Sequence, residues 1–453
     1  MAEKENLFDK SVFQYANKNT PIPVPDGADR NALSKMFDTN STCFTTMDYK
    51  AKKSSQIKPE IVKEVNKTDA KEYRKWNGKC ITPYERKQLK ELKTKAFDEI
   101  LFDDIDERSE LFLLKKLLTK PNNTQTWSDF LYLYSLFIDN GWAAVWGEKL
   151  KYGVNANKYQ NLYQLPTHLI DILGGTHSDP ISGYRFKNNY QTTYAESDVI
   201  RISSGSLKYD TNGGHLYGVS KIKVAYEEFA VISKALEREF NSFDGGDVRA
   251  MFMPKTDIGL PSEALTENTT WFQKFRDGIL KGLKQRSPQR FAIIGHPVDV
   301  VQFSDQLKTQ LTTEAITRSE AKVSSIWGLH PNVVFAGNKD STFANQKEYI
   351  ADSLRSGVFP DLRKLEEAMR ENIVKAGWKG YSLNFDYDVY EELNTDIKKE
   401  IESLSKADFL SDNEKREWID MEYLEDEKAN IPRAYWAELF PPITPEPASG
   451  EDI

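Results

Sequence analysis

Cysteine and histidine are scarce in this sequence. Only two of 453 residues are cysteine, Cys43 and Cys80, which excludes a disulfide framework and argues against a cysteine-rich zinc site. The five histidines are scattered, and each is interpreted as a structural or surface residue. Long apolar runs are also missing, since the longest, Leu131–Ile138, is far too short to cross a bilayer. The first ten residues are charged and lack the apolar core of a signal peptide, so we expect a protein made in a reducing cytoplasm, with no membrane partner.

Signature motifs of common enzymes are missing as well. No Gly-Lys-Ser/Thr sequence follows a glycine-rich turn, and neither H-E-x-x-H, C-x-x-C nor G-x-S-x-G occurs. The glycine-rich segment Gly213–Gly218 is interpreted as a plain turn rather than a phosphate cradle. We therefore expect no catalytic residue, no metal and no cofactor. A nuclease or peptidase built from scattered carboxylates is the enzyme alternative, and it predicts turnover by the purified protein.

Composition and charge indicate a water-facing globular protein. Hydrophobic residues make up 39% and charged residues 29%, and 453 residues are too many for one ordinary core, so we expect two or more domains. The net charge of −8 shows no overall basic bias. Residues 50–95 nevertheless carry fifteen Lys/Arg against six Asp/Glu, and residues 385–453 carry twenty acidic against seven basic residues. These stretches are either solvated faces or, alternatively, an interaction arm and an acidic rim.

Periodicity and capping patterns predict the main elements. The first hundred residues are weakly periodic and are expected to be partly extended. Thr126 and Asp129 form a capping-box pattern before an aromatic helix that ends at Asn140-Gly141. Short strands with turn residues between them follow. The expected strands are Leu162–Leu165, Gly183–Phe186 and Asp198–Ile202.

Two long helices are expected on either side of a compact insertion. The first has a single apolar stripe from Ile222 to Phe243, and the second, capped by Ser304 or Asp305, is mostly polar. Strands are expected at 248–253, 291–294 and 298–303 of the insertion, and a helix at 271–283. A loop then leads to a helix at about 342–373, bent or broken at Pro360. Further helices are expected at 395–407 and after a capping box at Ser411 and Glu414, and the Pro-rich end, 441–453, is expected to be disordered.

Several motif blocks occur in a defined order between about Leu111 and Trp418. They are Leu117-Leu118 with Pro121-Asn122, Tyr163-Gln164-Leu165-Pro166, Asp198-Val199-Ile200-Arg201, Leu216-Tyr217-Gly218-Val219-Ser220, Ile326-Trp327-Gly328-Leu329-His330-Pro331, Thr342-Phe343-Ala344-Asn345-Gln346, and Pro360 with Leu365-Glu366-Glu367. In this order the blocks resemble the portal proteins of tailed bacteriophages of the HK97 type. Two positions depart from the family pattern, because Lys221 stands where proline is usual and His330 replaces the first of two prolines.

The resemblance implies an α+β portal fold with a mixed α/β wing, a two-helix stem, a small α/β clip and a helical crown. The segments that it implies are an N-terminal arm or extension (1–100), the first part of the wing (101–219), stem helix 1 (220–243), the clip (244–305), stem helix 2 (306–327), a tunnel loop (328–341), the long bent helix of the wing (342–390), the crown (391–440) and a disordered tail (441–453).

The same resemblance implies the function. Such a chain is expected to form a homo-oligomeric ring, a dodecamer, at one capsid vertex of the virion after assembly in the host cytoplasm. The ring would be the channel for packaging, retention and ejection of double-stranded DNA, without sequence specificity. Its expected partners are the terminase large subunit, the head–tail adaptor or neck protein, the major capsid protein and the scaffold. A non-viral interaction scaffold is the third alternative, and it predicts a monomer or dimer.

Two sets of candidate site residues follow. A basic stretch of the clip contains a single acid, Asp277, and is either a solvated helix face or a docking surface for an acidic partner or for passing phosphates. The six basic residues are Lys274, Arg276, Lys281, Lys284, Arg286 and Arg290. The tunnel loop would meet DNA without base readout, because transport has to ignore sequence. Its candidate residues are Asn332, Asn338, Lys339 and Asp340.

Overall fold

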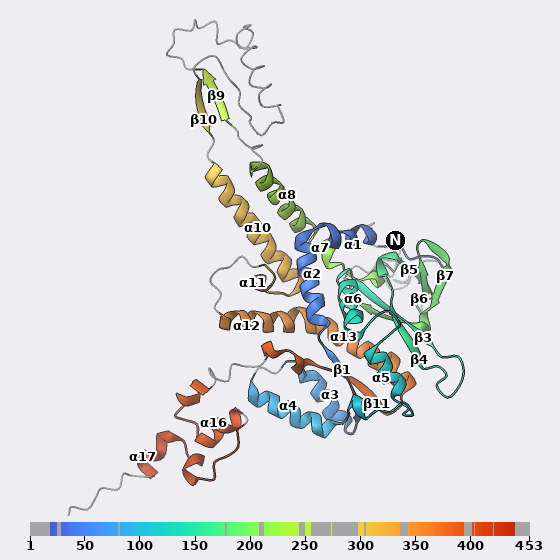
Figure 1. Cartoon of the computed structure of the whole chain (residues 1–453), viewed down its shortest axis with the longest axis vertical. Coiled ribbons are helices and arrows are strands. Elements are labelled where there is room, and N and C mark those ends of the chain that lie inside the picture. The colour runs from blue at the N-terminus through green and yellow to red at the C-terminus, as the bar shows by residue number, and fades with distance from the viewer. Residues whose placement is uncertain are drawn as a thin grey trace, which may run out of the picture.

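The computed structural model describes residues 19–24, 29–79, 82–176, 179–207, 213–243, 250–254, 273, 298–302, 305–335, 343–393, 401–402, 404–419 and 421–439. A two-helix hairpin projects from a mixed body of helices and small sheets, and a further helical segment lies at the opposite end (Figure 1). The expected mixture of helices and strands is therefore present.

The first hundred residues are more regular than the sequence predicts. The described part of this segment contains four helices and two strands. Each helix begins at a polar side chain, Asp29, Asn40, Asn66 or Thr82, that accepts a hydrogen bond from a free amide. The many lysines of this segment obscured the helical periodicity of its apolar residues. The elements are α1 (Arg30–Thr39), α2 (Ser41–Ser54), β1 (Lys58–Glu64), α3 (Lys67–Trp76), α4 (Pro83–Ala96) and β2 (Phe97–Ile100).

Three antiparallel three-stranded sheets make up the β structure of the body. In the first, β1 is central, and Ile61 pairs with Ile100 of β2 on one side and Leu383 of β11 on the other. This sheet joins the N-terminal segment to a strand more than 300 residues later in the sequence. The other two sheets have the orders β4-β3-β8 and β5-β6-β7. Their strands are β3 (Trp142–Lys149), β4 (Tyr159–Gln164), β5 (Ile170–Gly174), β6 (Ile181–Phe186), β7 (Asn189–Ala195) and β8 (Val199–Ser203), with β11 at Tyr381–Asp386.

The main core lies around helix α6 (Trp127–Asp139). Its predicted capping box is present, with Thr126 and Asp129 satisfying each other's backbone amides. Aromatic and leucine side chains of α6 pack with those of α5 (Phe112–Thr119), the sheets and the long helix described next. The strands expected at Leu162–Leu165, Gly183–Phe186 and Asp198–Ile202 are confirmed to within three residues.

The long helix expected at 342–373 stays helical through Pro360. The five residues before α13 form a π-helical turn in which the Phe359 amide bonds to the Leu354 carbonyl, and Pro360 then occupies the first turn of α13, where its missing amide is tolerated. A second π-helical turn follows. The segments are α12 (Phe343–Ser353), η7 (Leu354–Val358), α13 (Phe359–Met369), η8 (Arg370–Val374) and α14 (Lys375–Gly377).

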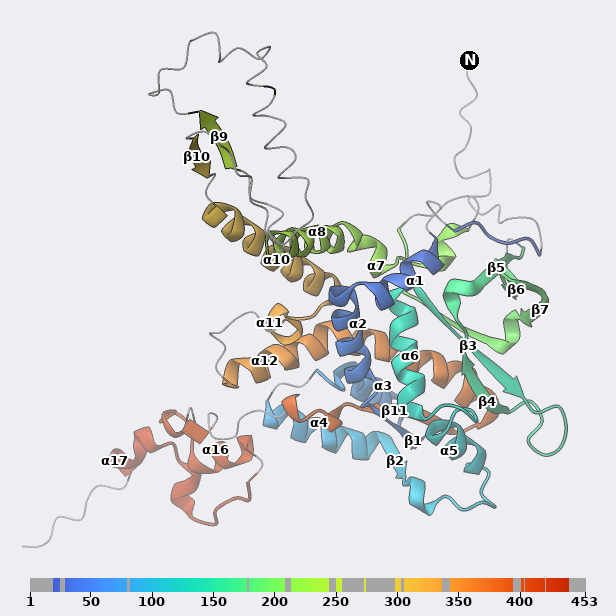
Figure 2. The ribbon, with the colours of Figure 1, turned by 45° about the horizontal axis from the view of Figure 1, so that its top comes forward.

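The projecting hairpin consists of α8 (Tyr226–Phe243) and α10 (Asp305–Trp327), which lie side by side in both views (Figure 2). The first helix, expected from 220, is interrupted at Ala225, with the short α7 (Lys221–Val224) before it. At the tip, β9 (Ala250–Pro254) pairs with β10 (Val298–Gln302), which confirms two of the expected strands. The helix expected at 271–283, apart from Gln273, and the strand at 291–294 lie outside the described residues.

The C-terminal segment contains α16 (Asp412–Trp418), which begins at the predicted capping box of Ser411 and Glu414. Trp418 stacks on Tyr84 of α4 at 5.6 Å between ring centroids, so this segment contacts the body. The helix expected at 395–407 lies partly, and the tail 441–453 wholly, outside the described residues. The remaining short elements are η2 (Phe102–Asp104), η3 (Thr167–Leu169), η4 (Glu196–Asp198), η5 (Gly214–Tyr217), α11 (Pro331–Val334), η9 (Tyr387–Val389), η10 (Glu391–Leu393), η11 (Glu427–Asn430), η12 (Arg433–Tyr435) and α17 (Trp436–Leu439).

Candidate functional site

The root of the projecting hairpin is where distant segments of the chain meet. Buried apolar side chains of α2, α7, α8 and α10 form one cluster there, with Met47, Ile222 and Val323 among them. Phe229 of α8 and Trp327 of α10 pack with ring centroids 6.1 Å apart. The hairpin is therefore anchored to α2, a helix from the N-terminal segment.

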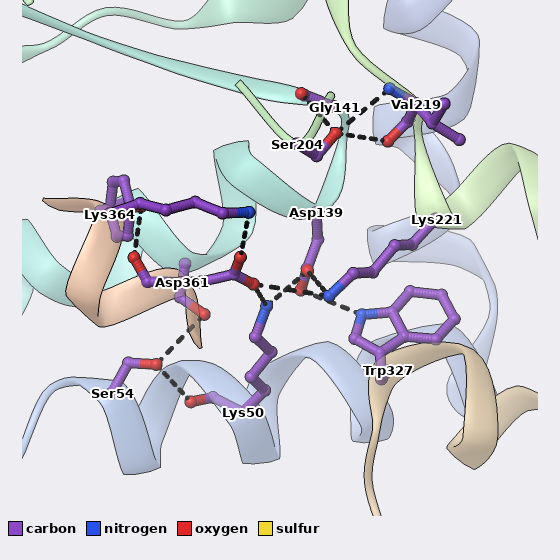
Figure 3. A network of polar contacts seen from close by, with 12 residues as sticks. Lys50, Ser54, Asp139, Gly141, Ser204, Val219, Lys221, Trp327, Asp361 and Lys364 are labelled. Atoms are coloured by element: carbon purple, nitrogen blue, oxygen red, sulfur yellow. Dashed lines mark hydrogen bonds and ion pairs between the residues drawn. The ribbon is translucent and has the colours of Figure 1, made fainter. Parts of the chain in front are cut away.

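A buried charge network lies beside this cluster (Figure 3). The ammonium group of Lys50 is 2.6 Å from Asp139 Oδ1 and 2.7 Å from Asp361 Oδ2. Lys221 approaches the same two oxygens at 3.1 and 3.5 Å, and Trp327 donates its indole N–H to Asp139 Oδ2 at 2.9 Å. Two lysines and two aspartates thus join α2, α6, α7 and α13, and the indole ties the end of α10 to them.

Burial and charge act in opposite directions on these groups. Burial alone would lower the pKa of Lys50, but the two aspartates outweigh it and raise that pKa. Burial alone would raise the pKa of Asp361, but Lys50 and Lys221 outweigh it and hold that pKa well below its usual range. Lys50 and Asp361 consequently stay ionised around neutral pH. The attraction within the network compensates the cost of desolvation only while every partner is present.

Arg30 holds the hairpin entry from the other side. Its guanidinium donates to the Asn140 carbonyl at the end of α6 and, at 2.9 Å, to the Gly218 carbonyl just before α7. Burial lowers the pKa of Arg30 to about 10. Ser220, the cap of α7, donates to the side chain of Asn140 at 3.1 Å. The N-terminal helices therefore contact both regions: α2 supplies Lys50 to the charge network, and α1 supplies Arg30 to the start of the hairpin.

The chain leaves the hairpin through a tight turn at Gly328. This residue has a φ of +69°, and its carbonyl accepts a hydrogen bond from Ser356 in the π-helical turn at 2.7 Å. His330 then caps α11 and stacks on Tyr349 of α12, with 3.8 Å between ring centroids. The beginning of the segment expected to be the tunnel loop is thus packed against the long helix.

The shaft of the hairpin exposes apolar side chains. On α8, Val231, Leu236 and Phe240 are 39%, 44% and 70% exposed. One ion pair, Lys322 Nζ to Glu228 Oε1 at 2.6 Å, links the two helices at the surface, where such a pair contributes little. Leu236 and Phe240 are four residues apart and lie on one face of α8, whereas Val231 lies on another face.

The described parts of the chain hold no group of three or more His, Cys, Asp or Glu placed to bind a metal ion. None of their helices is long and apolar enough to span a membrane. The charged groups of the network are paired with one another, so we interpret the network as structural: it connects the helices to which its members belong.

Comparison with known proteins decides the family. A sequence model described as phage portal protein matches residues 92–420. The chain belongs to the phage portal protein family. The match begins at 92, earlier than the resemblance expected from about Leu111, and it includes the hairpin, the insertion and the long helix. A search of curated proteins gives no significant match.

Several solved structures are similar to this chain. A chain from the neck of an empty gene transfer agent (GTA) particle, computed with C6 symmetry, has a TM-score of 0.55 at 15% identity, over 90% of this chain and 97% of that one. A chain from the neck of the native GTA particle, computed with C12 symmetry, has a TM-score of 0.54 at 14% identity over the same shares. An HK97-family phage portal protein from Corynebacterium diphtheriae has a TM-score of 0.46 at 10% identity, over 77% of this chain and 93% of that one.

The predicted site residues of this portal-family chain are placed only in part. Asn332 lies half-buried in α11, and its backbone N–H donates to His330 Nδ1 at 3.3 Å. The other tunnel-loop candidates, Asn338, Lys339 and Asp340, lie outside the described residues. The six clip candidates also lie outside them; these are Lys274, Arg276, Lys281, Lys284, Arg286 and Arg290.

Sequence reasoning missed the charge network at the hairpin root. A signal for it exists, because Cys43, Met47, Lys50 and Ser54 share one face of α2 at helical spacing, which places a lysine among buried positions. A lysine on such a face has to be paired. Its partners, Asp139 and Asp361, are 89 and 311 residues away and could not be found from spacing.

Proposed function

We propose that twelve copies of the chain form a ring at one vertex of a phage-like capsid, as the channel through which double-stranded DNA is packaged, retained and ejected. The match of the portal family to residues 92–420 carries this proposal. The GTA neck computed with C12 symmetry supports the subunit number, since its chain has the same fold. The exposed apolar side chains of α8 give each copy a surface that a neighbour would cover. The proposed location is the virion, after assembly in the host cytoplasm, and the role is structural rather than catalytic.

The parts of the fold take roles in this proposal. The helices α8 and α10 are the stem, and the insertion between them is the clip, where the terminase large subunit and the head–tail adaptor would dock. The mixed body is the wing, which would contact the major capsid protein and the scaffold. The segment after α11 is the tunnel loop, and the helices after residue 391 are the crown.

Native mass spectrometry of the purified chain, with negative-stain microscopy of the same sample, tests the ring. The expected result is a particle of about twelve subunits with a central hole. A monomer or dimer that persists in the presence of capsid and scaffold proteins contradicts the proposal and favours an interaction scaffold. Turnover of nucleic acid or peptide by the pure protein would favour the enzyme alternative.

Two packaging experiments test the candidate residues. Changing Lys281, Lys284 and Arg286 to Glu is expected to block DNA packaging without affecting ring assembly, and normal packaging contradicts the docking role. Deleting residues 338–340 is expected to impair packaging or retention, and a normally filled head contradicts a role of this loop in holding DNA.

A further inference from the structure

A basic groove of about 630 Å³ lies between α3 and the helical segment α13–η8. Five cationic side chains line it: Lys71, Arg74 and Lys75 from α3, Arg363 from α13, and Arg370 from η8. Three of these belong to the lysine- and arginine-rich stretch at 50–95, and the fold adds two arginines that are far away in the sequence. We refer to this feature as the α3–α13 groove.

The three arginines are held in place by contacts that use only part of their donor capacity. Arg74 donates to Glu64 Oε1 at 2.7 Å and to Asn384 Oδ1 at 3.1 Å, and Arg363 donates to the Asn77 carbonyl at 2.7 Å. The Nε–H groups of Arg363 and Arg370 are buried and have no acceptor among the described residues. A guanidinium that is held in a fixed position beside a groove suits the planar, charge-assisted recognition of an anion.

The charges in the groove are crowded. Burial lowers the pKa of Arg370, and the nearby Arg74 lowers it further. An anion between such groups would relieve their mutual repulsion, as phosphate does in clusters of arginine. A bound anion is therefore expected to stabilise the α3–α13 groove.

Acidic side chains only partly neutralise the groove. Glu72 and Glu367 are exposed, Glu366 is buried 3.6 Å from Arg370, and Glu64, just outside the lining, pairs with Arg74, so five cations meet four carboxyl groups. Burial raises the pKa of Glu366 to about 7, against the opposing effects of Arg370, Arg74 and the Tyr387 hydroxyl. The groove therefore carries a net positive charge on a chain whose formal net charge is −8.

We propose that the α3–α13 groove binds phosphate groups of the DNA backbone without reading its bases. This inference rests on the proposed function, which makes DNA the polyanion that every copy meets. Guanidinium forks suit phosphate oxygens, and the lysines at the groove add mobile charges. The Lys75 ammonium also lies 5.4 Å from the ring centroid of the neighbouring Trp76.

Fluorescence anisotropy with labelled DNA duplexes of two unrelated sequences tests this proposal on the full-length protein. The double variant Lys71→Gln/Lys75→Gln is expected to bind both duplexes about tenfold more weakly and to lower the slope of log affinity against log salt by about 2. The matched control is Lys63→Gln/Lys67→Gln, which removes the same charge from exposed positions of β1 and α3 outside the groove. The control is expected to retain the affinity and salt slope of the wild type.

Equal losses in both double variants would overturn the proposal, because binding would then depend on overall charge alone. Tighter binding of poly-glutamate than of DNA, lost in the groove variant only, would also overturn it and assign the groove to an acidic protein segment. Ring formation is measured separately on the same samples. A ring without groove-dependent DNA binding refutes only this inference, whereas a groove that binds DNA on a chain unable to form rings refutes the proposed function.

Discussion

Lys50 places its ammonium group between Asp139 and Asp361, where solvent is excluded. The side chains of Lys50 and Asp139 are fully buried, and that of Asp361 is 11% exposed. Removing one member of a buried ionic group leaves the others uncompensated in a medium of low polarity. The network therefore contributes more through the penalty for its loss than through its net attraction.

Lys50→Met tests this penalty. The change keeps most of the side-chain volume but leaves the two buried carboxylates to Lys221, 3.1 Å from Asp139, and to the partly exposed Lys364, 3.1 Å from Asp361. We therefore expect the free energy of unfolding to fall by about 3–5 kcal/mol. Urea unfolding followed by tryptophan fluorescence measures it. The control is Lys52→Met, two residues along α2, where the side chain is 69% exposed. That variant should change stability by less than about 1 kcal/mol, and equal effects in both would contradict the role of the network.

Glu366 predicts a pH dependence of stability. Its folded-state pKa of about 7 lies above the unfolded value of about 4.3, so the folded chain binds the extra proton between these values. The stability contributed by this group is full below the unfolded pKa and is lost as pH rises through 7. Glu366→Gln, which mimics the protonated form, should raise the melting temperature at about pH 8 and change it little at about pH 4.

The size of this effect follows from the shift, which corresponds to about 4 kcal/mol. Glu367→Gln, at the exposed neighbouring position, is the control and should leave the pH profile unchanged. A Glu366→Gln profile parallel to that of the wild type from acidic to alkaline pH would show that Glu366 does not change protonation in this range.

At the scale of elements, the turn after α10 depends on close backbone packing. Gly328 has a positive φ, and a Cβ there would lie 2.8 Å from the Ser356 carbonyl oxygen in the π-helical turn. Gly328→Ala should therefore lower the free energy of unfolding by about 2–4 kcal/mol, from backbone strain and steric overlap together. Gly153→Ala is a matched control, because its φ of +90° is also positive but nothing lies within 4 Å of a Cβ. It should cost only about 1 kcal/mol, and equal losses in urea unfolding would mean that the approach to Ser356 is unimportant.

Elements with a local signal could be predicted from the sequence. The capping boxes at Thr126 and Ser411 both begin helices, since each involves residues only three positions apart. The continuity of the helix through Pro360 could not be predicted, because it depends on a π-helical turn that is held by packing against Gly328. The pairing of β1 with β11 and the charge network were missed because their partners are 89 residues or more away in the sequence. The basic groove was visible only as an excess of charge at 50–95.

At the scale of the whole molecule, the exposed side chains of α8 should matter for assembly and not for the fold of one copy. Leu236→Ser with Phe240→Ser is expected to reduce the fraction of rings in mass photometry while leaving the melting temperature of the monomer within about 2 °C of the wild type. The exposed pair Tyr152→Ser/Val154→Ser, in the β3–β4 loop, is a control for lost apolar surface and should leave ring formation unchanged. Loss of rings in both variants would indicate a general change in solubility.

The hairpin also has mechanical consequences. Helix α10 has 23 residues and is thus about 35 Å long, and its lower end is fastened at Trp327 to the charge network. A rotation of about 5° at that end would displace Asp305, at the other end, by about 3 Å. The buried charges therefore lie at the point about which the long helix α10 would rotate. Sub-ångström adjustments among Lys50, Asp139 and Asp361 would be amplified into movements large enough to make or break contacts at the far end.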